Sequence, residues 1–343
     1  MAPQLPDIGS PTADNRPRLH PGTSGYEFWQ LQINDPEHQF GWRIRLTVTH
    51  AKDTPSGAEV QFAYFNRYNP DNENRRVSQE FDPEHFEIRG NRDEPFEFRA
   101  GNIVLTGESC QGILSTFEET IRWKLAWFND PDSQFRHWPN RRFYRWKYPR
   151  TKMLTPVPRS MIGGKISVGA LDVGLEEAYG HMAHWWGRRY PERWHWAHCT
   201  AFEETDFASL EMYEIRLNHW LPKFTLVQLE LFGELFEFNS LRQAIRNASE
   251  PGPESWMVAA ESETHRLQVE LQTRAESFIK SDTALFSEPG KYVKFTGIAS
   301  MQVLLSEWLE NEWHVHKKLT CRDAAAYEYG TNNTKRERPG QST

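Results

Sequence analysis

The chain has few cysteines, no long apolar run and no excess of positive charge. Its 343 residues include three cysteines, Cys110, Cys199 and Cys321, whose wide spacing predicts neither a disulfide framework nor a CxxC metal site. No run approaches the roughly 18 apolar residues of a membrane-spanning helix, so no membrane span is expected. Lysine and arginine number 40 against 47 acidic residues. Because polyanion-binding surfaces usually carry clustered positive charge, nucleic acid is not an expected partner.

Motifs of the common cofactor and nucleophile classes are also missing. Gly163-Gly164 lacks the third glycine of a phosphate-binding loop, and no GxSxG elbow is present. His195 and His198 fall on opposite faces of an extended strand, without cysteine or carboxylate at metal-ligand spacing. We therefore expect no metal and no cofactor. The first 22 residues lack the apolar stretch of a secretory signal, which makes a cytoplasmic location the expectation.

What the chain has in abundance is aromatic residues, 13% of the sequence with 14 tryptophans. They stand in short runs of period two, as in residues 42–48, where every second residue is apolar. Such alternation is typical of half-buried strands, and turn clusters such as 53–57 separate the runs. Helical patterns are few, and 240–248 is the one short candidate. Many short strands predict an all-β fold of sandwiches or barrels.

A segment rich in proline and arginine, residues 131–158, interrupts the strand rhythm. We expect it to join two all-β domains, 26–150 and 151–330. The polar residues 1–25 and 331–343 predict a flexible N-terminal arm and a flexible tail. No repeat of fixed period is visible along the chain.

Glu27 is the most informative carboxylate. It shares the more apolar face of its predicted strand with Trp29 and Ile33. Burial disfavours the charged form of a carboxylate, so an inward Glu27 is suited to donate a proton near neutral pH. The alternatives are that this strand is an edge strand, or that Tyr26 and Phe28 point inward, because a shift of one residue moves every side chain to the other face.

The densest aromatic stretch is 180–202. In a strand over 194–202, Trp194, Trp196 and His198 share a wide face, whereas His195 and Cys199 lie on the smaller one. The wide face either fills a core or lines a ligand cavity. The predicted catalytic residues are Glu27, His184 and His198. The predicted substrate-binding residues are Trp29, Tyr64, Trp123, Trp127, Trp185, Trp186, Trp194, Trp196 and Thr200.

The sequence YGHMAHWWG at 179–187, followed by YPERWHWAHC at 190–199, resembles the signature of tocopherol cyclase. It is similar, more loosely, to carotenoid 1,2-hydratases and lipocalin-like Diels–Alderases. Residues 26–29 resemble the N-terminal strand of these proteins, and the likeness extends over most of 26–330. It implies two lipocalin-like β-barrel or sandwich domains packed together around an apolar pocket. The implied chemistry needs no redox cofactor: ring closure, hydration or pericyclic cyclisation of an isoprenoid, a polyketide or another lipophilic substrate.

The chain departs from the family pattern at the acid. Ala183 stands where relatives carry aspartate or glutamate, and His198 and Thr200 replace a glutamine and an asparagine. His184, His198 or Glu27 replaces the acid unless the reaction has no proton-transfer step. The expected function is a cofactor-independent cyclase or isomerase with a lipophilic small molecule as its partner. The alternatives are a lipophile carrier and an isoprenoid hydratase. The chain is expected to be a monomer or a homodimer.

Overall fold

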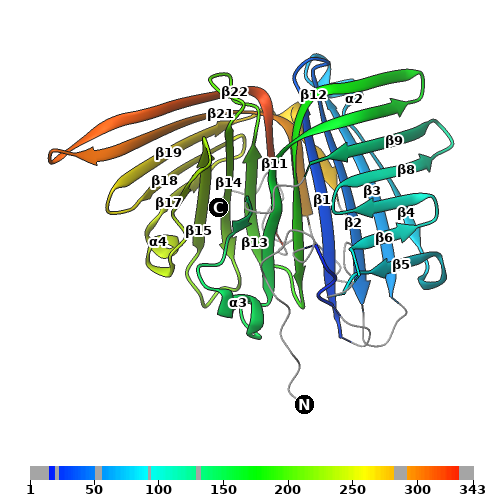
Figure 1. Ribbon diagram of the computed structural model, residues 1–343, viewed down its shortest axis with the longest axis horizontal. Coiled ribbons are helices and arrows are strands. Elements are labelled where there is room, and N and C mark those ends of the chain that lie inside the picture. The colour runs from blue at the N-terminus through cyan, green and yellow to red at the C-terminus, as the bar shows by residue number, and fades with distance from the viewer. Residues whose placement is uncertain are drawn as a thin grey trace, which may run out of the picture. The chain divides into compact units, whose positions relative to one another are not determined.

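The computed structural model describes residues 15–19, 23–50, 56–91, 94–128, 133–281 and 292–331. Antiparallel strands make up most of it, with a few short helices (Figure 1). The chain forms two compact units, Met1–Tyr68 with Arg75–Arg189, and Asn69–Asn74 with Tyr190–Thr343. One sheet lies in each unit. The predicted all-β fold is therefore confirmed, and in the part of the chain that is described no helix is long and apolar enough to span a membrane.

The first unit contains a sheet of 12 strands. Its elements are β1 (Gly25–Asp35), β2 (Phe40–His50), β3 (Gly57–Asn66), β4 (Arg75–Phe81), η1 (Pro83–His85), β5 (Phe86–Arg89), β6 (Glu97–Ala100), β7 (Ile103–Thr106), β8 (Ser109–Ser115), β9 (Thr120–Trp127), β10 (Phe135–Arg136), α3 (Arg141–Arg145), β11 (Thr151–Val168) and β12 (Leu171–Gly187).

The second unit contains a sheet of 10 strands. Its elements are α2 (Pro70–Glu73), β13 (Arg193–Cys199), β14 (Ala208–Arg216), β15 (Phe224–Leu231), β16 (Glu234–Glu237), α4 (Leu241–Arg246), β17 (Ala248–Pro251), β18 (Ser255–Glu261), β19 (His265–Gln272), η2 (Ala275–Ser277), β20 (Ile279–Ser281), β21 (Tyr292–Leu309) and β22 (Glu312–Thr331).

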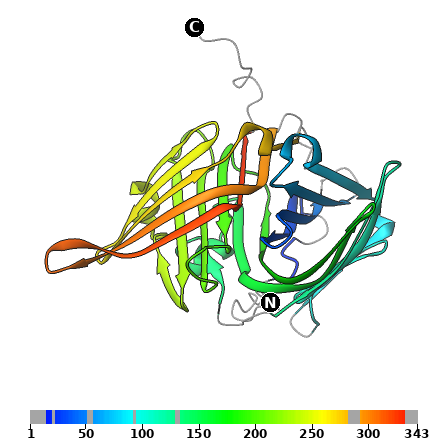
Figure 2. The ribbon, with the colours of Figure 1, turned by 90° about the horizontal axis from the view of Figure 1, so that it is seen from above.

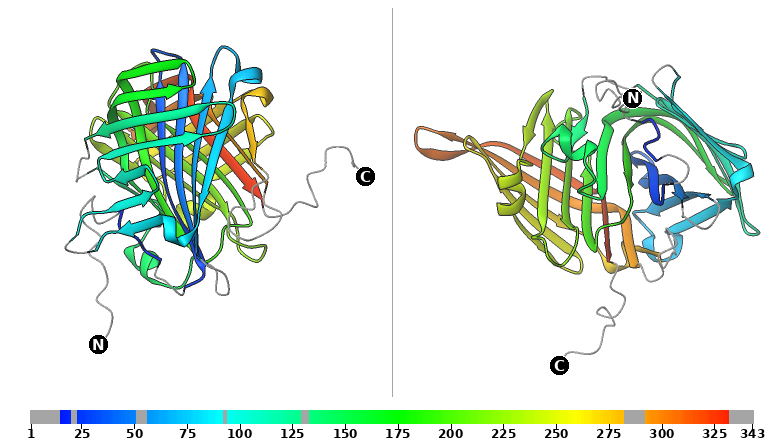
Figure 3. Two further views of the ribbon diagram at one scale, coloured as in Figure 1. Left: turned by 90° about the vertical axis from the view of Figure 1, so that its right-hand side faces the viewer. Right: turned by 90° about the horizontal axis from the view of Figure 1, so that it is seen from below.

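The two sheets share one connectivity. Each begins with a meander of four strands, and in each the first strand pairs with the last: β1 with β12, and β13 with β22. Each also ends in a long hairpin, β11–β12 and β21–β22. The strands of the first sheet curl around its core, whereas the β21–β22 hairpin extends beyond its neighbours (Figures 2 and 3). The repetition lies in strand pairing, which is why no repeat of fixed period is visible in the sequence.

The boundary between the units falls at Arg189 and Tyr190, whereas the sequence analysis expected it at residue 150. The reason is strand pairing: β11 pairs with β9, and β12 pairs with β1, so both strands complete the first sheet. The proline-rich segment holds β10, α3 and the start of β11. It is a connection within the first unit.

Residues 15–19 belong to the expected flexible arm, yet they are fixed to the first unit. The indole Nε1 of Trp29 donates to the Asn15 carbonyl at 2.9 Å. The backbone N–H groups of Arg18 and Leu19 donate to the Glu27 carboxylate at 2.8 and 2.9 Å. Residues 1–14 and 20–22, and the tail beyond residue 331, lie outside the described residues.

Each unit has its own apolar core. In the first, the inward face of β1 carries Trp29, Leu31 and Ile33, all 2% exposed or less. In the second, Ala197 and Cys199 of β13 face the core. The strand phase predicted for β1 is thus confirmed: Glu27, two residues before Trp29, shares the inward face.

Candidate functional site

Glu27 is a carboxylate at the end of the first core. It is 2% exposed, although charged side chains are rarely buried without partners. Oε1 accepts the N–H of Arg18 and Oε2 accepts the N–H of Leu19. These hydrogen bonds suit an ionised carboxylate, which accepts and does not donate.

His184 is the side-chain partner of Glu27. The β1–β12 register places His184 opposite Trp29 and diagonal to Glu27, so all three share one face. Nε2 of His184 lies 2.7 Å from Oε1 of Glu27, and both side chains are buried. The Trp29 ring stacks on the imidazole with centroids 4.9 Å apart, and the Trp186 ring lies 4.8 Å away. A buried carboxylate–imidazole pair therefore sits between two indole rings.

Lys152 adds a cationic group to this end of the unit. The register of β11, β12 and β1 places Lys152 beside Trp186, which in turn lies beside Glu27. Its Nζ donates to the Pro149 carbonyl. Burial lowers the pKa of Lys152 to about 8. Sequence reasoning missed this residue, and the signal for it was a lysine in a stretch, 151–157, that otherwise holds only apolar residues and threonines.

Tyr64, Trp123 and Trp127, predicted to bind substrate, belong to the same core cluster as Trp29. The indole Nε1 of Trp123 donates to Cys110 Sγ at 3.2 Å, and that of Trp127 to the Gly107 carbonyl at 2.9 Å. Trp123 also borders a surface hollow of about 400 Å³. Both indoles have partners within the unit, as core tryptophans usually do. A substrate-binding role for these three residues stays a prediction.

Trp185 lies on the opposite face of the first sheet. It stacks on Phe28 at 5.4 Å, and the Arg45 guanidinium lies 4.5 Å above the Phe28 ring. Arg45 donates to the side-chain oxygen of Gln30, which pairs in register with Ala183. Ala183, the position at which the resemblance implies an acid in other proteins, therefore lies on this face, away from Glu27.

This second face was missed by sequence reasoning. It is polar yet buried: Gln30, Gln32 and Asn34 of β1 are 2% exposed or less. The signal was a row of neutral amides at the alternate positions of β1, where a solvated face more often carries lysine or glutamate. Amides keep their hydrogen-bonding capacity when buried, so such a row suits a buried polar surface.

The wide aromatic face of β13 is buried in the second unit, but it is the small face that turns to the unit's core. Trp196 Nε1 donates to Glu211 Oε1 at 2.8 Å, and Trp194 Nε1 donates to Glu328 Oε1 at 3.0 Å. The His198 ring is nearly parallel to Trp196, with centroids 6.4 Å apart. The residue after β13, Thr200, is 1% exposed. The structure thus places His198 in a different unit from the Glu27–His184 pair.

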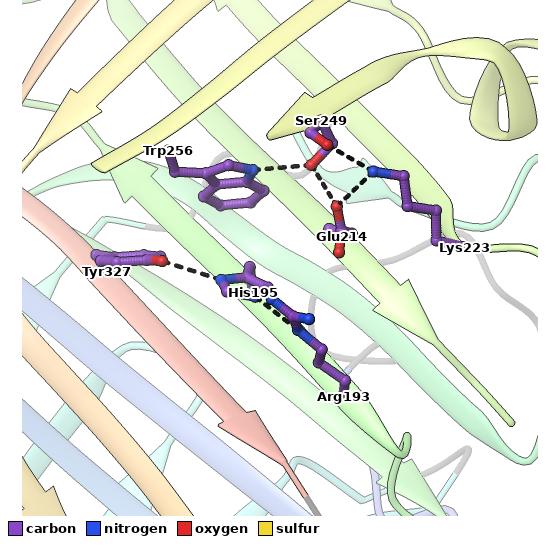
Figure 4. Close-up of polar contacts among 7 residues, drawn as sticks. All are labelled: Arg193, His195, Glu214, Lys223, Ser249, Trp256 and Tyr327. Atoms are coloured by element: carbon purple, nitrogen blue, oxygen red, sulfur yellow. Dashed lines mark hydrogen bonds and ion pairs between the residues drawn. The ribbon is translucent and has the colours of Figure 1, made fainter. Parts of the chain in front are cut away.

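His195, on the small face, joins a second polar network (Figure 4). Its Nδ1 lies 2.9 Å from the hydroxyl of Tyr327, and its Nε2 accepts the Nε–H of Arg193 at 3.2 Å. Burial lowers the pKa of His195 to about 3, and the charges of Arg193 and Lys223 act in the same direction. This histidine is therefore neutral at physiological pH.

The neutral state of His195 predicts a pH dependence of stability. An unfolded histidine titrates near 6.5, and the folded one near 3. Between these values the unfolded state binds the extra proton, so the free energy of unfolding falls as pH is lowered, by about 1.4 kcal/mol per unit. His195→Gln retains an acceptor and a donor but does not titrate. Urea unfolding at pH 7, 6, 5 and 4 should give a smaller loss for the variant. If the free energy of unfolding falls equally with pH in the native chain and the variant, the low pKa of His195 is contradicted.

Other candidate sites have weaker support. A groove of about 1190 Å³ in the second unit, bordered by Arg242, Arg246, Trp308 and Trp313, contains none of the predicted site residues. Among the described residues, no group of three or more histidine, cysteine, aspartate or glutamate side chains is arranged to hold a metal ion.

The predicted family resemblance is confirmed by comparison with known proteins. Residues 153–301 match the tocopherol cyclase-like family. Kievitone hydratase from Nectria haematococca has a similar fold at 10% identity, with a TM-score of 0.56 over 95% of this chain and 92% of that one. CghA has a TM-score of 0.53 at 8% identity, over 90% of this chain and 88% of its own. Among curated proteins, none matches the chain.

Proposed function

We propose that this chain, which resembles the tocopherol cyclase-like proteins, is a cofactor-independent cyclase or isomerase of a lipophilic isoprenoid or polyketide-type substrate. The observation that carries the proposal is the buried pair of Glu27 and His184, joined at 2.7 Å between the rings of Trp29 and Trp186. Ring closure that begins with protonation needs a group that donates a proton and aromatic rings that stabilise the resulting positive charge. A neutral histidine alone, or a tryptophan alone, would not supply both.

The pair can supply both. The Glu27 carboxylate stabilises a proton held on His184, and the imidazolium donates it to an alkene carbon of the substrate. The carbocation that forms lies against indole faces, and each cation–π contact contributes roughly 0.5–2 kcal/mol. Glu27 keeps its orientation through the backbone N–H groups of Arg18 and Leu19. The return of a proton from product to His184 closes the cycle.

A hydratase is the second candidate, since water addition to an alkene also begins with protonation. The same pair serves both reactions, and the outcome depends on whether an internal nucleophile or water captures the cation. The fold shared with kievitone hydratase supports keeping this candidate. A carrier would bind the same molecules without converting them.

The test is product analysis with labelled solvent. The purified chain is incubated with a panel of prenylated hydroquinones and linear polyenes in D₂O and, separately, in H₂¹⁸O. Ring closure started by protonation places deuterium on carbon, whereas hydration places ¹⁸O in the product. A cyclised product without solvent atoms supports a cyclase but contradicts the role of the pair. Binding without conversion across the panel would contradict the enzyme proposal and favour a carrier.

A further inference from the structure

The second unit contains a buried tyrosine hydroxyl at the end of a chain of hydrogen bonds. Arg193 only donates, because a guanidinium has no acceptor. Nε2 of His195 therefore carries its lone pair toward Arg193, and the ring hydrogen of the neutral imidazole is on Nδ1. Nδ1–H accordingly donates to the hydroxyl oxygen of Tyr327 at 2.9 Å.

The hydroxyl hydrogen of Tyr327 is thus left to donate elsewhere. Tyr327 is fully buried, and among the described residues its hydroxyl is bonded to His195 alone. Burial, with the charges of Tyr329 and Glu214, raises the pKa of Tyr327 despite Arg193, so the phenol keeps its hydrogen. Buried hydroxyl groups nearly always find an acceptor. The chain from Arg193 through His195 also polarises this terminal donor, because successive hydrogen bonds strengthen one another.

Aromatic rings surround the phenol. The centroids of Trp256, Phe278 and Tyr329 lie 5.8, 5.9 and 5.9 Å from that of Tyr327. All belong to the core of the second unit or pack against it. These rings offer an apolar surface for the body of a ligand whose polar atom meets the hydroxyl.

Trp256 is held in place by a second chain of hydrogen bonds (Figure 4). Its Nε1 donates to Ser249 Oγ at 2.9 Å, and that hydroxyl donates to Oε2 of Glu214 at 2.5 Å. Lys223 donates to the same oxygen at 3.1 Å. Both the phenol and the indole are therefore oriented by side chains behind them, as in preorganised binding sites.

We propose that Tyr327 is the hydrogen-bond donor of a second ligand site in this unit, which takes an apolar molecule with a neutral carbonyl oxygen. A neutral acceptor fits better than a carboxylate, because burial is the largest influence on Tyr327 and disfavours a charged group beside it. The site is separate from the Glu27–His184 pair and does not depend on the reaction proposed for it.

The experiment uses benzophenone and diphenylmethane, which share two phenyl rings and differ in the carbonyl oxygen. Quenching of tryptophan fluorescence gives the Kd of each probe for the full chain. Tyr327→Phe keeps the ring and should weaken benzophenone about fivefold, the loss of one neutral hydrogen bond, without changing diphenylmethane. Tyr26→Phe, which removes a buried hydroxyl bonded to Thr151 at 3.0 Å in the first unit, is the matched control and should change neither Kd.

Photo-crosslinking locates the bound benzophenone independently of affinity. Irradiation should attach one probe per chain to peptides containing Trp256, Phe278 or Tyr329, and mass spectrometry identifies them. Cross-links elsewhere, or none at the solubility limit of the probe, would overturn the proposal. So would an equal weakening of both probes in Tyr327→Phe, since that result indicates loss of packing rather than of a donor. These outcomes do not depend on whether any substrate is cyclised.

Discussion

Replacing Glu27 by glutamine is expected to lower kcat by about 10²- to 10⁴-fold, the range over which general acid–base groups act. Glutamine has nearly the same shape, but it lacks the charge that stabilises a proton on His184, 2.7 Å away. His184→Asn should cause a similar loss, and the double variant should be hardly worse than either single one, because the two residues act as a unit. The measurement is kcat and KM for whichever panel substrate the native chain converts.

Two controls make the result decisive. Trp42→Phe shortens a fully buried indole of the same core that has no predicted role in the site, so it should lower the melting temperature while kcat stays within a few-fold. Glu211→Gln removes an equally buried carboxylate, bonded to Trp196 and Tyr213 in the second unit. If Glu211→Gln abolishes turnover and Glu27→Gln does not, the acid lies on β14, beside His198 of β13, and the role of Glu27 is refuted.

Gly180→Ala is expected to destabilise the first unit by about 1–3 kcal/mol or more, as overpacked sites do. A Cβ at Gly180 would stand 2.4 Å from the backbone oxygen of Gln32 and 2.5 Å from Ile162 Cδ1. Because Gln32 belongs to β1, the clash pushes β12 away from β1, the two strands that bring His184 to Glu27. Urea unfolding followed by tryptophan fluorescence measures the loss, and turnover should fall with it.

Gly174→Ala is the matched control for this substitution. Gly174 lies on the same strand, β12, and a Cβ there would meet nothing within 4 Å. Because alanine loses less backbone entropy than glycine on folding, this variant should be as stable as the native chain or up to about 1 kcal/mol more stable. Equal destabilisation by both alanines would show that the β1–β12 approach at Gly180 is less tight than the structure indicates.

The local sequence pattern was sufficient to predict the strands and to predict which face of β1 points inward. Trp29, Leu31 and Ile33 alternate with polar residues, and burial of one face requires that alternation, so Glu27 could be placed inward from sequence alone. The same reasoning could not show that Gln30 and Gln32, on the other face, are buried too. Alternation reports a difference between two faces, not what covers the more polar one.

The domain boundary shows a different limit. A proline-rich segment marks a break in strand pattern, but domain membership depends on which strands pair. β12 pairs with β1, whose residues lie about 150 positions earlier, as with Glu27 and His184, which are 157 residues apart. No periodicity within a short window contains that information, so the expected boundary fell before β11.

The sequence analysis predicted the site as one group of residues, but the structure divides these residues between the two units. Trp29, His184 and Trp186 gather around Glu27, whereas His198 and Trp196 lie in the other unit with Glu211. Composition and motif could identify which residue types were concentrated, but not which of them meet.

By itself, the sequence determined an all-β chain with buried indoles and an inward carboxylate, because side-chain alternation and residue type act over a few neighbouring positions. Only the tertiary structure decided that His184 contacts Glu27, that His195 forms a hydrogen bond with Tyr327, and that both faces of β1 are buried. Those contacts arise from pairing between strands far apart in the chain, where register and sheet connectivity, rather than local preference, set the distances.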